Sequence, residues 1–74
     1  MARLLRLDNT GHSTLAVWTE ADQASCEAAI EAFRRELDEG FIAVVNEGEG
    51  RATQVRELPL DSDLVILRRP ISGG

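Results

Sequence analysis

The chain has 74 residues, 43% of them hydrophobic, which is enough for one small globular domain and too few for two. Thirteen acidic residues face eight arginines and no lysine, so the formal net charge of −5 argues against nucleic acid and anionic membranes as partners. The single cysteine, Cys26, excludes an internal disulfide and a cysteine-rich metal site.

No targeting or membrane-spanning segment is expected. The apolar run at the start of the chain is too short for a signal peptide, and Asp8 interrupts it. No stretch approaches the roughly 20 apolar residues that a membrane span requires. We therefore expect a soluble, cytoplasmic protein.

The first elements expected along the chain form a β-hairpin. Residues 3–7 are short, apolar and interspersed with arginine, and residues 14–18 alternate in a β-branched setting. Residues 8–11 lie between them and include Asn9 and Gly11, which tolerate positive φ angles. Two such runs around a turn of this composition are typical of a hairpin.

A helix is expected next, over residues 19–39. Thr19 can cap its first turn, with Asp22 placed to reach back to the cap, and Gly40 follows its last turn as a C′ residue. Residues at steps of four, three and four form one apolar face: Cys26, Ile30, Phe33 and Leu37. This face predicts that Cys26 is a buried, structural cysteine.

Three strands and a tail are expected in the second half. Residues 41–45 are continuously apolar, residues 51–55 form a shorter, more polar edge strand, and residues 64–67 form the last strand. Residues 46–50 are a turn and residues 58–63 a loop. Pro70 ends the last strand, so we expect a domain over residues 1–70 and a flexible tail over residues 71–74.

This order of elements predicts an α+β fold, in which one helix packs across one face of a mixed sheet of four or five strands. Leu15 and Val17 are expected to meet the helix. The strands 41–45 and 64–67 are apolar on both faces, yet one helix covers only one. The open face should therefore present apolar side chains, which bind a partner unless loops or a second copy cover them.

The Gly73-Gly74 ending is the sharpest signal in the sequence. At ordinary glycine usage a terminal pair arises by chance in roughly 0.5% of chains. Glycine has no Cβ, so such an end can pass through a narrow channel and approach a bound nucleotide closely. The alternative is a flexible end without function, or an addition from cloning.

Residues 41–74 resemble the second half of the ubiquitin-like sulfur carriers, such as the small subunit of molybdopterin synthase and the thiamine-pathway carrier. Three pieces carry the resemblance: Val45-Asn46, Leu60-Asp61-Ser62-Asp63 before an apolar strand, and Pro70-Ile71-Ser72-Gly73-Gly74. The first half is similar only in the order of its elements. The resemblance implies a ubiquitin-like β-grasp, in which the first and last strands lie side by side and parallel.

Two positions depart from the pattern of the sulfur carriers. Ser62 stands where that family usually has glycine, and Arg68-Arg69 stands where aromatic or apolar residues are common. Leu67-Arg68-Arg69 before the Gly-Gly end is closer to the tail of ubiquitin. Sulfur carrier and protein modifier therefore both remain open.

What the resemblance implies is chemistry at Gly74. An activating enzyme would use ATP to adenylate its carboxylate, and sulfur or an enzyme cysteine would then attack, giving a thiocarboxylate or a thioester. An acceptor enzyme or target protein would follow. The tail that meets these partners comprises Arg68, Arg69, Pro70, Ile71, Ser72, Gly73 and Gly74. On this hypothesis the chain is a carrier rather than an enzyme, with no catalytic residue, metal or cofactor of its own.

A second hypothesis from another class is a non-catalytic ubiquitin-like interaction module that binds through its open sheet face. A very small enzyme is disfavoured, because no nucleophile–base pair or metal cluster is visible in the sequence. His12 has no partner at catalytic spacing and is expected in the first turn. Asp61 and Asp63 lack the further ligands of a calcium loop, so turn chemistry explains them better.

Overall fold

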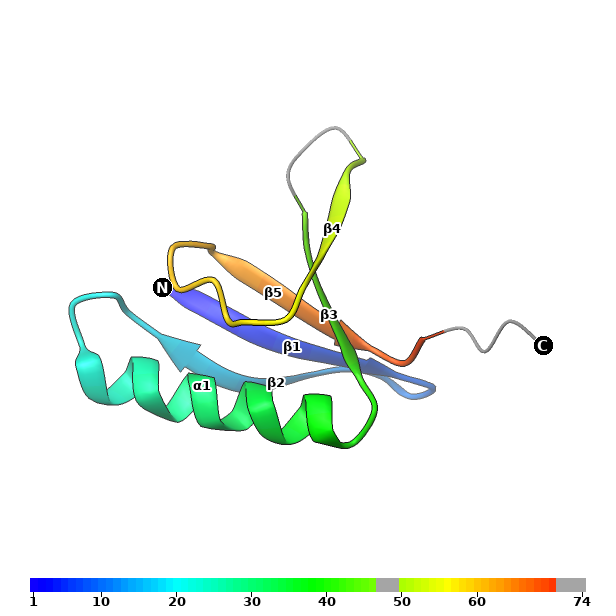
Figure 1. Cartoon of the computed structure of the whole chain (residues 1–74), viewed down its shortest axis with the longest axis horizontal. Helices are drawn as coiled ribbons and strands as arrows, with labels where there is room; N and C mark the ends of the chain where they lie inside the picture. The colour runs from blue at the N-terminus through cyan, green and yellow to red at the C-terminus, as the bar shows by residue number, and fades with distance from the viewer. Residues whose placement is uncertain (47–49, 71–74) are drawn as a thin grey trace.

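A computed structural model describes residues 1–46 and 50–70, which form a small α+β domain with one helix and a five-stranded mixed sheet (Figure 1). The elements follow one another as β1 (Ala2–Asp8), β2 (Gly11–Trp18), α1 (Gln23–Asp38), β3 (Ile42–Asn46), β4 (Ala52–Val55) and β5 (Leu64–Arg68). Within the described residues, no helix is long and apolar enough to cross a membrane.

The strands lie in the order β2-β1-β5-β3-β4. β5 runs parallel to β1, with Leu5 opposite Ile66, while the remaining neighbours are antiparallel. This confirms the expected pairing of the first and last strands and the edge position of the 51–55 strand. The arrangement is compatible with a β-grasp.

The helix begins later than the sequence predicted. Its N-cap is Asp22, whose carboxylate accepts a hydrogen bond from the Ala24 backbone N–H at 3.2 Å, and not Thr19. The Thr19 carbonyl instead accepts from the Asp22 N–H at 2.8 Å, which closes a turn ahead of the helix. The carboxylate of Asp caps a helix as well as the hydroxyl of Thr does, and Asp22 lies directly before the first helical residue, so Asp22 is the N-cap.

Gly40 is the C′ residue that follows the helix, as expected. Gly40 has φ +99°, its N–H donates to the Leu37 carbonyl, and the Phe41 N–H donates to the Glu36 carbonyl. These two bonds form a Schellman motif, which needs a left-handed residue at the C′ position. The motif turns the chain sharply, so that Phe41 lies at the end of the core where α1 ends.

The buried face of α1 is rotated from the predicted one. Buried positions are Cys26, Ala29, Phe33 and Glu36, whereas Ile30 and Leu37 are only half-buried. The buried set also recurs at steps of three, four and three, and Glu36 is held inward by its hydrogen bond from Arg6, so Ala29 and Glu36 take the places predicted for Ile30 and Leu37. Cys26 is buried, as predicted.

The prediction that Val17 contacts the helix is wrong. The β1–β2 pairing shifts between Leu4 and Leu5, which leaves Leu15 as an extra residue in β2. A bulge of this kind reverses the alternation, so Val17 is 40% exposed while its neighbour Trp18 is 1% exposed. Leu15 still packs against the core, as expected.

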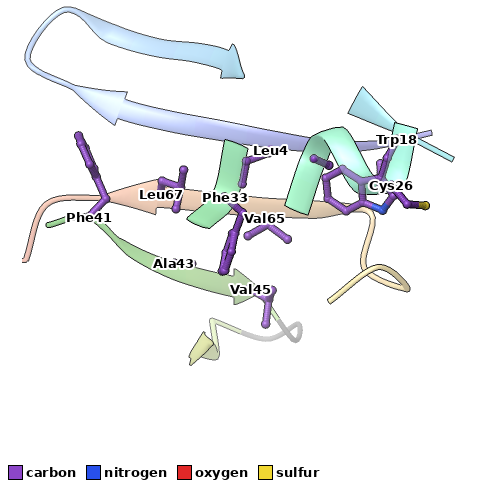
Figure 2. Close-up of a cluster of buried hydrophobic side chains, with 11 residues drawn as sticks. Leu4, Trp18, Cys26, Phe33, Phe41, Ala43, Val45, Val65 and Leu67 are labelled. Atoms are coloured by element: carbon purple, nitrogen blue, oxygen red, sulfur yellow. The ribbon is translucent and has the colours of Figure 1, made fainter. Parts of the chain in front are cut away.

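The core runs the length of the sheet between two aromatic residues. Figure 2 shows Phe41 at one end of the cluster, Trp18 and Cys26 at the other, and Phe33 between them. The indole Nε1–H of Trp18 donates to the Leu60 carbonyl at 3.1 Å, which ties the 58–63 loop to that end. The chain leaves the sheet at the opposite end, where α1 ends and β3 begins (Figure 1).

Candidate functional site

The predicted site residues begin where β5 ends. Arg68 is the last residue of β5, and Arg69 and Pro70 follow it as exposed residues. Ile71, Ser72, Gly73 and Gly74 lie outside the described residues. Of the expected tail, the described residues are Arg68, Arg69 and Pro70.

The two arginines of the tail point in different directions. Arg68 pairs with Ile42 in the β5–β3 register and belongs, with Leu64 and Ile66, to the alternate set facing away from the helix. The guanidinium of Arg69 lies over the ring of Phe41, with its Cζ 4.7 Å from the ring centroid. The sequence placed both on one partner-binding tail, but the structure assigns them to opposite faces.

Phe41 joins Arg69 to a second charged pair. The guanidinium of Arg6 lies 5.7 Å from the same ring centroid, and it donates to Glu36 Oε1 at 2.8 Å. Alternation along β1 turns Arg6 toward the helix together with Ala2 and Leu4, and Glu36 comes from the last turn of α1. Glu36 is 9% exposed and the Arg6 side chain is 34% exposed, so this ion pair is partly desolvated but remains open to salt on the Arg6 side.

Two open hollows flank this stack. One, of about 290 Å³, is lined by Leu7, Asp8, Asn9, Phe41 and Arg69. The other, of about 390 Å³, is lined by Arg6, Asp8, Glu36, Glu39, Phe41 and Arg69. Hydrogen bonds from the Thr10 hydroxyl and backbone N–H lower the pKa of Asp8, which is therefore a carboxylate at neutral pH. Carboxylates thus surround the Arg69 guanidinium without an ion pair to it among the described residues.

The open face of the sheet is the second candidate site. The register places Leu5, Ile66 and Val44 in one row across β1, β5 and β3, and all three are half-buried although no helix covers this face. Leu64 and Ile42 lie on the same face, also half-buried, and Val17 lies on it with 40% of its surface exposed. The expected apolar open face is therefore present in the described residues.

The charges on this face differ from those of the whole chain. Among the described strand residues that alternate onto it, two are cations, Arg3 and Arg68, and none is an aspartate or glutamate. The chain as a whole carries a net charge of −5. The acids therefore lie elsewhere, several of them on the solvent side of α1, including Glu27, Glu31 and Asp38.

The sequence analysis did not identify Phe41, Arg6 and Glu36, which gather around Arg69 where the chain leaves β5. A signal was present: Arg6 continues the inward-facing set of its strand, and Glu36 lies three residues after Phe33 on the helix. An inward arginine and an inward glutamate predict each other, because a buried charge needs a partner. His12, expected in the first turn, is instead an exposed residue of β2.

No three His, Cys, Asp or Glu side chains gather into a metal-binding group within residues 1–46 and 50–70. The contacts present around Arg69 and on the open face are cation–π contacts, an ion pair and exposed apolar side chains. Compared with models of protein families, with curated proteins and with solved structures, the chain matches none of them, so its resemblance to the ubiquitin-like carriers rests on its own residues.

Proposed function

We propose that this chain is a ubiquitin-like β-grasp carrier that is activated at the carboxylate of Gly74. The observation that supports the proposal is the position of β5. It lies inside the sheet, parallel to β1, and its last residues leave the domain beside a cluster of charged groups. A rigid strand of this kind can present the following residues to a partner from a constant position.

The proposed reaction is adenylation followed by transfer. The Gly74 carboxylate attacks the α-phosphate of ATP in the active site of an activating enzyme, and pyrophosphate leaves. A sulfur nucleophile then attacks the acyl carbon of the mixed anhydride, and AMP leaves. Attack by sulfide gives the thiocarboxylate directly. Attack by an enzyme persulfide gives an acyl persulfide, and a second enzyme thiol then cleaves its S–S bond, which releases the thiocarboxylate and leaves an enzyme disulfide. Attack by an enzyme cysteine gives a thioester for transfer to a target protein.

The carrier contributes binding and geometry to this reaction. Gly73 and Gly74 carry no Cβ, so the backbone can approach ATP closely. Arg68 and Arg3 offer cations beside the apolar row Leu5, Ile66 and Val44, which suits a partner surface with an apolar centre and acidic edges. The activating enzyme supplies the catalytic groups and binds the ATP.

The test is ATP–pyrophosphate exchange with activating enzymes purified from the source cell, together with the intact mass of the native C-terminus. Wild-type protein is expected to support exchange, and the native mass is expected to show sulfur in place of oxygen or conjugation to a protein. Deletion of Gly74, or Gly73→Val, should abolish exchange and change the free energy of unfolding by about 0.5 kcal/mol or less. Ser72→Ala is the matched control and should retain exchange.

A wild-type chain that no activating enzyme adenylates, and that always carries a plain carboxylate in the cell, would contradict the proposal. The second candidate function would then be favoured: a non-catalytic interaction module that uses the open face. The acid-free, arginine-flanked apolar row is the observation that favours it.

One comparison separates the two functions. For an interaction module, deletion of Gly73 and Gly74 should leave partner binding unchanged, whereas Val44→Asp should abolish it. Gln54→Asp is the control, because Gln54 pairs with Val44 on the same face but lies outside the apolar row, on the edge strand. For a carrier, the deletion should abolish product formation even where binding persists.

A further inference from the structure

We infer that Arg69 is a positioning residue: its stack on Phe41 holds the start of the C-terminal segment against its own domain, while Arg68 faces the partner. The inference rests on the proposed function for its consequence in activation. The stack itself depends only on the fold.

The first step is the direction in which the chain leaves β5. Alternation places Arg68 on the open face, so the next residue, Arg69, turns toward the end of the core. There its guanidinium covers the Phe41 ring at 4.7 Å and also lies over the preceding bend. A Cβ built on Gly40 would be 4.0 Å from Arg69 Nη1. Arg69 therefore spans from the end of β5 to the end of α1.

The second step concerns the balance of charge at the ring. Two guanidinium groups near one ring repel each other, and Arg6 is already within 5.7 Å of it. Glu36 accepts a hydrogen bond from Arg6 at 2.8 Å and so cancels most of that positive charge. Asp8 and Glu39 line the hollow that Arg69 enters. The net field at the Phe41 ring therefore favours one further cation, which Arg69 supplies.

The third step is the consequence for the tail. With Arg69 held on the domain, and with φ of Pro70 restricted by its ring, the chain enters residues 71–74 from a fixed position. A partner that binds this segment then loses less conformational entropy on binding than it would with an unanchored tail. The stack should thus lower the KM for the carrier and leave kcat unchanged.

The competing explanation is that Arg69 leaves the ring and binds the partner directly, as Arg68 is proposed to do. A double-mutant cycle separates the two. If Arg69 acts through Phe41, then Arg69→Ala and Phe41→Leu remove the same interaction, and the double variant is no worse than either one. If Arg69 contacts the partner directly, the increase in KM of the double variant is the product of the increases caused by Arg69→Ala and by Phe41→Leu.

The first experiment needs no partner. In NMR spectra of the full chain, the Arg69 side-chain resonances should be shifted by the Phe41 ring current and return to random-coil values in Phe41→Leu. The backbone ¹⁵N heteronuclear NOE of Arg69 should fall equally in Arg69→Ala and Phe41→Leu. Arg68→Ala is the matched control and should change neither. Unshifted Arg69 resonances in the wild type would overturn the inference.

The second experiment measures carrier KM and kcat in ATP–pyrophosphate exchange. Arg69→Ala, Phe41→Leu and the double variant should each raise KM about two- to fivefold with kcat unchanged. Arg69→Lys keeps the charge and should recover part of the loss. Combining Arg68→Ala with Phe41→Leu should give the product of the two single effects. Multiplying effects of Arg69→Ala and Phe41→Leu would overturn the inference.

Failure of the inference differs from failure of the proposed function. If the wild type is never adenylated, the proposed function fails, and the NMR experiment alone decides whether Arg69 anchors the chain. If exchange proceeds and the Arg69 resonances are unshifted, the function stands and the positioning role falls. Phe41→Leu removes part of a core side chain, so the folding of this variant is checked by circular dichroism. Arg69→Ala removes the other partner of the stack, and because Arg69 is exposed this substitution leaves the core unchanged.

Discussion

The two ends of the core are both closed by an aromatic residue, but by different chemistry. Trp18 closes one end with a neutral hydrogen bond to a loop carbonyl. Phe41 closes the other beneath Arg69 and the Arg6–Glu36 ion pair. The neutral end joins the end of β2 to the 58–63 loop. The charged end lies where the C-terminal segment leaves, and ionic contacts of this kind weaken as the salt concentration rises.

This difference shows how a small domain can separate stability from binding. A neutral, buried closure keeps its strength in any ionic medium, whereas cation–π and ion-pair contacts at a half-open end are weaker and adjustable. We expect substitutions at the neutral end to change mainly the free energy of unfolding. Substitutions at the charged end should also change how firmly Arg69 is held against the domain.

The largest effect is expected at the residue between the two ends. Phe33 is 1% exposed, so Phe33→Ala should lower the free energy of unfolding by about 3–5 kcal/mol, measured by urea denaturation. In a 74-residue domain that is most of the total stability. Ile30→Ala is the comparison, and its smaller cost would confirm that the buried face runs through Phe33. An unchanged midpoint for Phe33→Ala would show that the core is elsewhere.

A matched pair of variants tests the contrast between the two ends. Trp18→Phe removes the indole hydrogen bond at the neutral end, and Glu36→Gln removes the ion pair at the charged end. Each should cost about 1–3 kcal/mol in low salt. Trp18→Phe leaves the Leu60 carbonyl without its donor, and Glu36→Gln leaves the part-buried Arg6 charge without a counter-charge, although the amide oxygen can still accept its hydrogen bond. Repeating urea denaturation in 1 M NaCl should shrink the cost of Glu36→Gln and leave that of Trp18→Phe unchanged. Equal salt dependence at both ends would contradict the comparison.

Gly40 tests the bend that delivers Phe41 to the charged end. Its φ of +99° is unfavourable for any residue with a Cβ, although a Cβ there would meet nothing closer than Arg69 Nη1 at 4.0 Å. Gly40→Ala should therefore cost about 1–2 kcal/mol through backbone strain rather than collision. Ala28→Gly, on the exposed helix surface, provides a control of about 1 kcal/mol for glycine entropy alone. A neutral Gly40→Ala would mean that the bend relaxes.

The smallest effect concerns pH at Asp8. Hydrogen bonds from Thr10 lower the pKa of this carboxyl in the folded chain, so its stabilising contribution is present above the unfolded pKa of about 3.9. That contribution is lost as the pH falls through the lower, folded value. Asp8→Asn should flatten this part of the stability–pH curve in thermal melts between pH 2 and 5. An Asp8→Asn curve with the same slope as the wild type in this range would contradict a stabilising contribution from the Asp8 carboxylate.

Local patterns were enough for much of the architecture. The continuous apolar run 41–45, the helical spacing of Cys26 and Phe33, and Gly40 after the helix each act within a few residues. They predicted the order of the elements, the edge strand and the apolar open face. Errors arose where one element is shifted against another: the bulge at Leu15, the cap at Asp22 and the rotated helix face.

The candidate site shows the same division. The sequence alone determined that Gly73-Gly74 follow two arginines, and that the sheet must leave apolar groups on one side. Only the tertiary structure decided that the side chains of Arg68 and Arg69 lie on opposite faces, and that Phe41, Arg6 and Glu36 gather around Arg69. Those contacts join β1, α1, the bend before β3 and the chain after β5. Their formation depends on strand register and helix rotation, which residue spacing along a single element does not encode.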